Sequence, residues 1–136
     1  MRRHDVVLRK HLAPTLPRVT GDQVQLQQVL INLIMNAIDA MNAVHDRPRE
    51  LTIISKADGS ERVLVEVRDS GIGLDPRHSE QVFEAFYTTK AEGIGIGLSI
   101  SRSIIEAHGG RLWASANALN GAVFCFSLPV AEEAVS

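Results

Sequence analysis

Asp69-Ser70-Gly71-Ile72-Gly73-Leu74 is the stretch of this sequence that says most about its fold and its site. It follows directly on residues 63–68, in which valines alternate with other residues as they do in a half-buried strand. The carboxylate of Asp69 is therefore expected at the end of a strand, next to a bend made by the two glycines. Glycine has no Cβ, so a ligand can approach the backbone closely there. Because Asp-x-Gly is also common in ordinary turns, the hexapeptide needs support from other segments.

Apolar periodicity around this stretch predicts one mixed, mainly antiparallel sheet with helices on one face. Residues with apolar side chains recur every three or four positions after Asp22, which is expected to cap a long helix. A second long helix is expected to stop at Gly109-Gly110. Strands joined by hairpins exclude an all-parallel sheet, so the fold class is an α/β (α+β) two-layer sandwich. The expected strands span residues 5–12, 51–56, 63–69, 111–115 and 123–128, and the expected helices span residues 24–44, 80–86 and 97–108.

Composition describes an ordinary globular domain. The chain has 136 residues, which fits one domain over residues 1–136. Its formal net charge is -2, from 14 basic and 16 acidic residues, and gives no reason to expect nucleic acid or an anionic membrane as a partner. The one cysteine, Cys125, excludes an internal disulfide and a cysteine-rich zinc site. No apolar run is long enough to span a membrane, so a cytoplasmic location is expected.

Three polar residues form a narrow stripe on the first long helix. Asn32, Asn36 and Asp39 are spaced i, i+4, i+7, so they lie within roughly 60° of one another on a helix that is otherwise largely apolar. Polar groups in such a place need partners. The two amides either bond neighbouring backbone or offer a carboxamide oxygen to a metal ion. Mg²⁺ accepts few protein oxygens and takes substrate phosphates, so a neutral asparagine suits a site whose negative charge comes from a nucleotide.

A third segment, residues 93–97, places three glycines where the second long helix begins. Backbone amides and the helix dipole favour phosphate at such a point. No Lys-Ser or Lys-Thr follows the glycines, and their spacing is not that of a dinucleotide fingerprint, so neither motif is present. Lys90 precedes the segment and offers a point charge to a phosphate, although a lone lysine in a loop is usually only solvated. Together the three segments indicate a nucleotide pocket.

These residues resemble the catalytic and ATP-binding domain of bacterial sensor histidine kinases, within the gyrase, heat-shock chaperone, histidine kinase and MutL superfamily. The resemblance extends over about residues 6–130, and the motifs stand in the family's order. The asparagine box corresponds to residues 28–37, the first glycine box to 69–74, the phenylalanine box to 82–90, the second glycine box to 93–98 and the closing strand to 121–124.

The resemblance implies a Bergerat fold, with about five strands under three helices and ATP bound beneath a lid. Asn36 matches the Mg²⁺-binding asparagine, Asp69 the aspartate that reads adenine, and Asn32 and Lys90 match positions close to the chemistry. ATP or ADP and Mg²⁺ are therefore the implied cofactors. The implied nucleotide-binding set is Asn32, Asn36, Asp69, Gly71, Gly73, Lys90, Gly93, Gly95, Gly97 and Leu98.

The resemblance also implies a reaction, in which the γ-phosphoryl group passes from Mg-ATP to a histidine on a separate dimerisation domain of a two-component sensor kinase. Gyrase-like relatives have a glutamate at the position of Asn32, and an amide cannot activate water in its place, so transfer is favoured over hydrolysis. A response regulator receiver domain is an indirect partner. Only Ala91 and Glu92 separate Lys90 from the second glycine box, a compact lid that resembles oxygen- and redox-type sensor kinases.

The family's acceptor motif has no match here. None of the five histidines, at positions 4, 11, 45, 78 and 108, is followed by an acidic residue and then Asn or Thr on a long helix. The dimerisation and phosphoacceptor domain is therefore expected to be absent, and the isolated domain is expected to be a monomer that does not phosphorylate itself. A nucleotide-binding regulatory module, anti-sigma-like or a degenerate kinase, is the alternative, and an interaction domain without nucleotide is a third reading.

Overall fold

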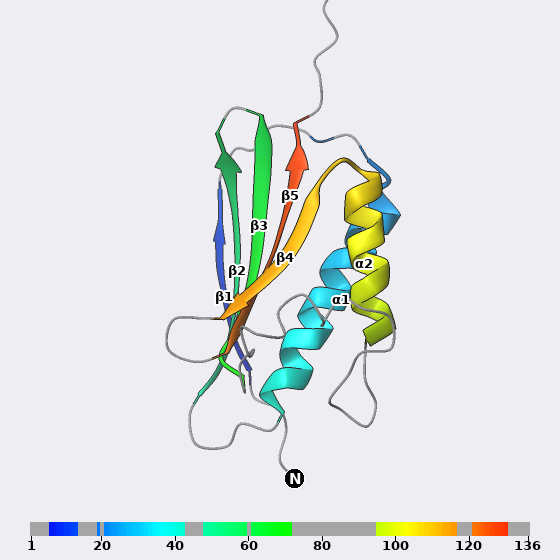
Figure 1. Cartoon of the computed structure of the whole chain (residues 1–136). Helices are drawn as coiled ribbons and strands as arrows, with labels where there is room; N and C mark the ends of the chain where they lie inside the picture. The colour runs from blue at the N-terminus through cyan, green and yellow to red at the C-terminus, as the bar shows by residue number, and fades with distance from the viewer. Residues whose placement is uncertain are drawn as a thin grey trace, which may run out of the picture.

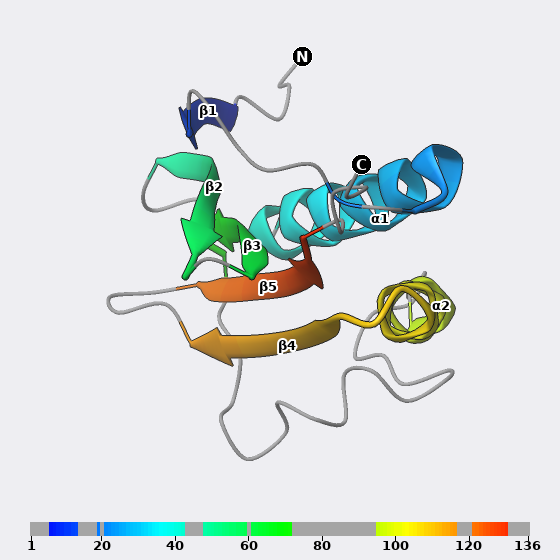
Figure 2. The same ribbon diagram turned by 90° about the horizontal axis from the view of Figure 1, so that it is seen from above.

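The computed structural model has two layers, a five-stranded sheet and a pair of helices that covers one of its faces (Figures 1 and 2). The structure describes residues 6–13, 19, 21–42, 48–59, 61–71, 95–116 and 121–130. The elements are β1 (Val6–Leu12), α1 (Gln23–Met41), β2 (Arg49–Asp58), β3 (Arg62–Asp69), α2 (Gly95–Ala107), β4 (Arg111–Ala116) and β5 (Ala122–Pro129). The predicted two-layer sandwich is confirmed, whereas the short third helix expected over residues 80–86 lies outside the described residues.

The sheet order is β1-β2-β3-β5-β4. β1 pairs with β2 in parallel and the other three pairings are antiparallel, which confirms a mixed, mainly antiparallel sheet. β5 therefore lies between β3 and β4, although β4 precedes it in the chain. Arg68 pairs with Val123, so the end of β3 lies beside the start of β5. This crossing of the chain brings two segments, about residues 69 and 121, together at one end of the sheet.

The core lies between the sheet and the two helices. Alternate residues of β5, Phe124, Phe126 and Leu128, face the helices, as the period of two predicts. The helices present apolar stripes to them at helical spacing. The buried members of these stripes and of the facing strands are Val29, Leu33, Ala37, Met41, Leu51, Val67, Leu98, Ile105 and Leu112. Neither helix of the described residues combines the length and the apolarity of a bilayer-spanning segment.

α1 begins where the sequence predicts and ends a few residues early. The Asp22 carboxylate caps the helix, because its Oδ1 accepts hydrogen bonds from the backbone N–H groups of Val24 (2.9 Å) and Gln25 (3.1 Å). The helix ends at Met41, although apolar periodicity predicts its end near residue 44. The N–H of Asn42 bonds back only three residues, and the carbonyl of Asn42 accepts from Arg49 Nη2 at 3.2 Å. The carbonyl just beyond the helix end is therefore bonded by a side chain of β2.

His108 joins the end of α2 to the start of α1. Its Nδ1 lies 2.7 Å from the carbonyl oxygen of Ile104 and donates to it, so Nε2 is the acceptor of the Asp22 N–H at 3.0 Å. A Cβ on Gly21 would lie only 2.5 Å from the His108 ring, so glycine is required for this contact. Gly109 has φ +79° and ends α2, which confirms the predicted left-handed cap. The two helices are thereby held side by side at this end.

Candidate functional site

Asp69 is a buried carboxylate at the end of β3. It is 2% exposed, and its Oδ1 accepts two backbone N–H groups, from Gly71 at 2.8 Å and from Ala122 at 3.2 Å. The bond to Gly71 is the Asx turn that such a sequence also forms in ordinary proteins. The bond from Ala122 comes from β5, 53 residues further along the chain. Bonds from the turn after β3 and from β5 fix the carboxylate in one orientation, which is the preorganisation that a recognition group requires.

Two glycines allow the surrounding backbone to approach Asp69. Gly71 is buried, and a Cβ on it would lie 2.7 Å from the carbonyl oxygen of Ala40 on α1. Gly121 has φ +87°, and a Cβ there would lie 2.0 Å from the carbonyl oxygen of Asp69. Neither distance is possible for a real side chain. Gly71 thus has a packing reason to be glycine, and the role in nucleotide binding that the sequence suggests for it stays a prediction.

The hydroxyl of Ser70 holds the neighbouring chain in place. Its Oγ accepts a hydrogen bond from the N–H of Glu50 (2.8 Å) and donates one to the carbonyl of Pro48 (3.1 Å). These bonds tie the end of β3 to the start of β2. Asp69 is therefore supported by β2 as well as by β5 and α1.

The asparagine stripe of α1 runs toward this carboxylate. Asn32, Asn36 and Ala40 follow one another at intervals of one helical turn, and Ala40 contacts Gly71, two residues after Asp69. Asn36 is 7% exposed, and no hydrogen bond links its amide to the described part of the chain. Buried amides are normally hydrogen-bonded, so a side chain in this state suits a ligand or a metal ion. These residues are compatible with Mg²⁺, whose ligands in proteins are oxygens.

Asn32 has a different environment from Asn36. Its Oδ1 accepts a hydrogen bond from Gln28 Nε2 at 2.9 Å, and its Nδ2 donates one to Ser101 Oγ of α2 at 3.0 Å. Of the two interpretations of the asparagine amides, bonding to neighbouring groups or binding a metal ion, the first therefore describes Asn32. A direct catalytic role for Asn32 stays a prediction.

The remaining predicted site residues lie in or before α2. Gly73, Lys90 and Gly93 are outside the described residues. α2 begins at Gly95, two positions before the expected start, so Gly95 and Gly97 stand in its first turn. The first N–H groups of a helix have no partner within it, as the phosphate interpretation requires. Leu98 is 5% exposed and belongs to the core, where it packs α2 against the sheet.

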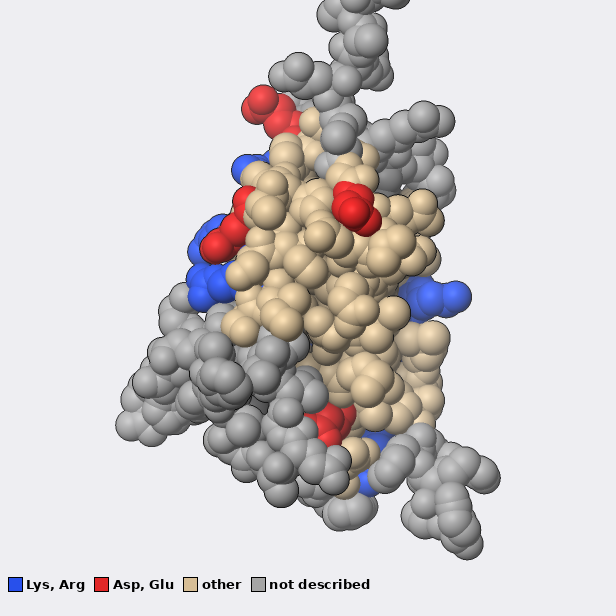
Figure 3. Space-filling model, turned by 90° about the vertical axis from the view of Figure 1, so that its right-hand side faces the viewer, with Lys and Arg blue, Asp and Glu red and all other residues tan. Residues whose placement is uncertain are grey.

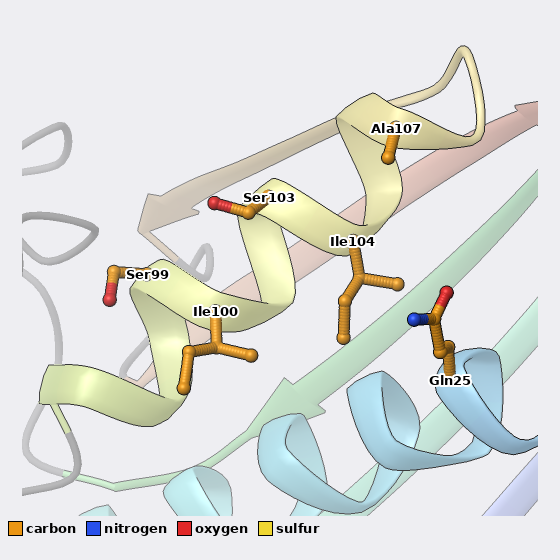
Figure 4. A pocket seen from close by; sticks show the side chains of 6 residues that line it. All are labelled: Gln25, Ser99, Ile100, Ser103, Ile104 and Ala107. Atoms are coloured by element: carbon orange, nitrogen blue, oxygen red, sulfur yellow. The ribbon is translucent and has the colours of Figure 1, made fainter.

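A groove among the described residues lies away from Asp69. This groove of about 530 Å³ lies between the outer sides of α1 and α2 and is lined by Gln25, Ser99, Ile100, Ser103, Ile104 and Ala107 (Figure 4). Charged side chains are sparse on the helical side of the molecule (Figure 3). The helices themselves carry four exposed apolar side chains, Val24, Ile31, Met35 and Ile100. The groove is open and contains none of the residues predicted to bind nucleotide. The candidate nucleotide site is therefore the region around Asp69 and Asn36.

The face of the sheet away from the helices carries a charged cluster around Cys125. Glu66 pairs with Cys125 across the sheet, and its Oε1 accepts from Arg68 Nη2 at 2.7 Å. On the outer strand the Arg111 guanidinium lies 4.8 Å from the centre of the Trp113 ring. Cys125 is 5% exposed. Burial, with a smaller contribution from Glu66, raises the pKa of the Cys125 thiol from 9.0 to about 11.

This raised pKa predicts a stability loss at high pH. The folded chain keeps the thiol proton after the unfolded chain has lost it, so the contribution is complete below pH 9.0 and is lost as the pH rises through about 11. The loss is expected to be about 2 kcal/mol, and Cys125→Ala should lack it. Urea unfolding of the parent and of Cys125→Ala between pH 8 and 11 gives the free energy of unfolding of each as a function of pH. The same pH dependence in both proteins would contradict the burial of the Cys125 thiol.

Four residues of this region, Gly121, Ser101, Gln28 and Ser70, are not predicted from the sequence to belong to the site. Gly121 looks like an ordinary turn glycine in the sequence, and its contact with Asp69 depends on β5 lying beside β3. Ser101 is 0% exposed and is a lone hydroxyl among apolar residues at helical spacing, and that isolation was the available clue. Gln28 and Ser70 had no such signal, because polar residues at their positions are unremarkable.

A mixed sheet under two helices, with a buried carboxylate beside an asparagine-bearing helix, is the arrangement that the sequence predicts for a nucleotide-binding domain. Comparison with known families agrees: residues 21–132 match the histidine kinase-, DNA gyrase B- and HSP90-like ATPase family. The chain belongs to this family, whose members bind ATP.

Individual relatives are sensor kinases. The chain is 48% identical over 132 residues to the sensor protein FixL of Bradyrhizobium diazoefficiens, covering 97% of this chain and 26% of FixL. The catalytic domain of histidine kinase ThkA superposes with a TM-score of 0.80 at 38% identity, covering 93% of this chain and 80% of that one. Full-length ShkA in complex with AMPPNP superposes with a TM-score of 0.79 at 28% identity, covering 97% of this chain and 27% of the ShkA chain. The chain thus spans about a quarter of the length of FixL and resembles the histidine kinase ATPase domain.

Proposed function

We propose that this domain binds Mg-ATP and delivers its γ-phosphoryl group to a histidine on a separate dimerisation domain of a two-component sensor kinase. The observation that carries the proposal is the Asp69 carboxylate, buried at the end of β3 and held by the N–H groups of Gly71 and Ala122. The similarity to sensor kinases supports the reaction. Because the transferred group comes from ATP, the proposed location of the domain is the cytoplasm, where ATP is available.

Asp69 would read the base. A carboxylate accepts hydrogen bonds only, so it pairs with the exocyclic amine of adenine and repels the carbonyl oxygen that guanine has at the same position. Because Asp69 is 2% exposed, water competes poorly for this bond. The expected preference is for ATP and ADP over GTP.

Asn36 would hold Mg²⁺ through its side-chain oxygen. The ion neutralises charge on the phosphates when it is bound. Asn36 suits this role because it is neutral, 7% exposed and without a hydrogen bond to the described residues. Lys90 and the glycines at 73, 93, 95 and 97 would line the phosphates, with the start of α2 presenting its N–H groups.

Positioning would account for most of the catalysis, since phosphoryl transfer needs little covalent help from a protein. Asn32 is an amide and does not take up a proton, so the nucleophile is the acceptor histidine itself. A response regulator would then receive the phosphoryl group from the histidine of the acceptor domain. One structural relative, ThkA, is known in complex with the response regulator protein TrrA. The relatives reported above give no support to a purely regulatory module.

Calorimetric titration with a non-hydrolysable ATP analogue tests the proposal. Binding that Mg²⁺ strengthens, and that ADP but not GTP competes away, is the expected result. Transfer is then followed with labelled ATP and a separately supplied histidine domain from a sensor kinase. A folded domain that binds no nucleotide would overturn the proposal, and binding without transfer to any supplied histidine domain would limit it to nucleotide recognition.

Asn36→Ala is expected to remove the strengthening by Mg²⁺. The loss should be about tenfold to 100-fold in affinity measured with Mg²⁺, with little change when the metal is chelated, because the alanine has no oxygen ligand. Gln27→Ala is the matched control, since Gln27 is an exposed amide on the same helix. If the analogue bound to Asn36→Ala with the parent's Mg²⁺ dependence, Asn36 would not be a metal ligand.

A further inference from the structure

Ser101 is the polar member of the stripe with which α2 packs on the rest of the domain. Leu98, Ser101 and Ile105 are spaced i, i+3, i+7 and are 5%, 0% and 0% exposed. A buried hydroxyl is costly unless it is hydrogen-bonded. An apolar residue at this position would have served packing alone, so the partner of the hydroxyl is informative.

That partner is the Asn32 side chain. Asn32 Nδ2 donates to Ser101 Oγ at 3.0 Å, while Asn32 Oδ1 accepts from Gln28 Nε2 at 2.9 Å. The two bonds engage opposite ends of one carboxamide. They hold its nitrogen toward α2 and its oxygen toward the preceding turn of α1. Ser101 therefore sets the orientation of Asn32 from a second helix.

The bond connects the two segments that the proposed function places around the phosphates. Asn36 follows Asn32 by one turn on α1, and Ser101 lies six positions after Gly95, where α2 begins. The helices lie side by side along this stretch (Figure 1). His108 and Asp22 join them again at the far end. The Asn32–Ser101 bond is thus a polar contact between the helix that carries the asparagines and the helix that begins at the glycines.

We propose that Ser101 is a positioning residue for the triphosphate, acting through Asn32 rather than by touching the ligand. The proposal rests on the proposed function, because it assigns Ser101 a task in the same site. Asp69, which the proposed function places at the adenine end, is not one of the two residues that this bond joins. Loss of the Ser101 hydroxyl should therefore weaken binding of the phosphates and leave binding of the base unchanged.

Ser101→Ala provides the direct test. We expect affinity for a non-hydrolysable ATP analogue with Mg²⁺ to fall about fivefold to tenfold, while adenosine binding, followed by NMR shifts, changes less than twofold. Ser101→Thr, which keeps the hydroxyl, should recover most of the loss. Ser101→Cys, with a weaker acceptor of similar size, should be intermediate. Ser103→Ala is the matched control, because Ser103 is exposed on the same helix.

A double-mutant cycle decides whether Ser101 acts through Asn32. Ser101→Ala should cause no further loss of analogue affinity in an Asn32→Ala background. Additive losses, unchanged affinity in Ser101→Ala, or equal losses for the analogue and adenosine would each overturn the inference, the last by showing a purely structural role. These results leave the proposed function standing. A folded parent that binds no nucleotide would overturn both.

Discussion

Asp69→Asn is expected to weaken ATP binding at least about 100-fold while changing stability by no more than about 1 kcal/mol. The asparagine keeps Oδ1, so it still accepts from Gly71 and Ala122 at the end of β3. The other carboxylate oxygen becomes an NH₂ group. Two donors then face each other where the adenine amine should be accepted, and a site 2% exposed gives water little chance to relieve the conflict.

Calorimetry with ATP and a urea unfolding curve measure the two quantities on the same protein. Asp58→Asn controls for the lost charge, because Asp58 is an exposed carboxylate at the far end of β2. ATP affinity equal to that of the parent would remove Asp69 from the site. A parallel fall in stability and affinity would instead show that Asp69 mainly holds the sheet together.

Gly121→Ala is expected to destabilise the domain by about 3 kcal/mol or more, one of the largest effects available from a single methyl group. Residue 121 has φ +87°, which costs any other residue strain, and the new Cβ would lie 2.0 Å from the carbonyl oxygen and 2.9 Å from Oδ1 of Asp69. Either β5 moves away from β3 or Asp69 moves out of place. The molecules that remain folded should therefore also bind ATP weakly.

Gly59→Ala separates the two causes. Gly59 has φ +72°, but a Cβ there would meet nothing within 4 Å. Its substitution should cost only the conformational strain, about 1 kcal/mol. Denaturant unfolding of both variants isolates the steric part as their difference. Equal losses would mean that Gly121 does not pack against Asp69 as tightly as the structure shows.

Local pattern was enough to predict most of the elements. Period-two alternation located all five strands to within two residues at either end, and helical periodicity with the Asp22 cap located α1 and α2. These signals are local, since burial of one face repeats every two or every 3.6 residues whatever lies opposite. The end of α1 at Met41 comes before the predicted end near residue 44, and Arg49 of the next strand bonds the carbonyl of Asn42 just beyond it, a contact that no local pattern records.

The candidate site was predictable as a set of motifs and not as a geometry. Asp69, Asn36 and the glycines at 95 and 97 were singled out by residue type and spacing. That Asn32 bonds Ser101, 69 residues away, and that Asp69 accepts from Ala122 were not, because no local pattern records which distant segments meet.

The sequence by itself determined the alternation that makes the strands, the apolar stripes that make the helices, and the polar residues from which a nucleotide pocket is predicted. Each of these is a property of neighbours along one element. Only the tertiary structure decided that β5 inserts beside β3, that Gly121 approaches the Asp69 backbone, and that Ser101 accepts a hydrogen bond from Asn32. Those contacts join residues far apart in the chain, and they arise when the sheet and helices bury their apolar faces together.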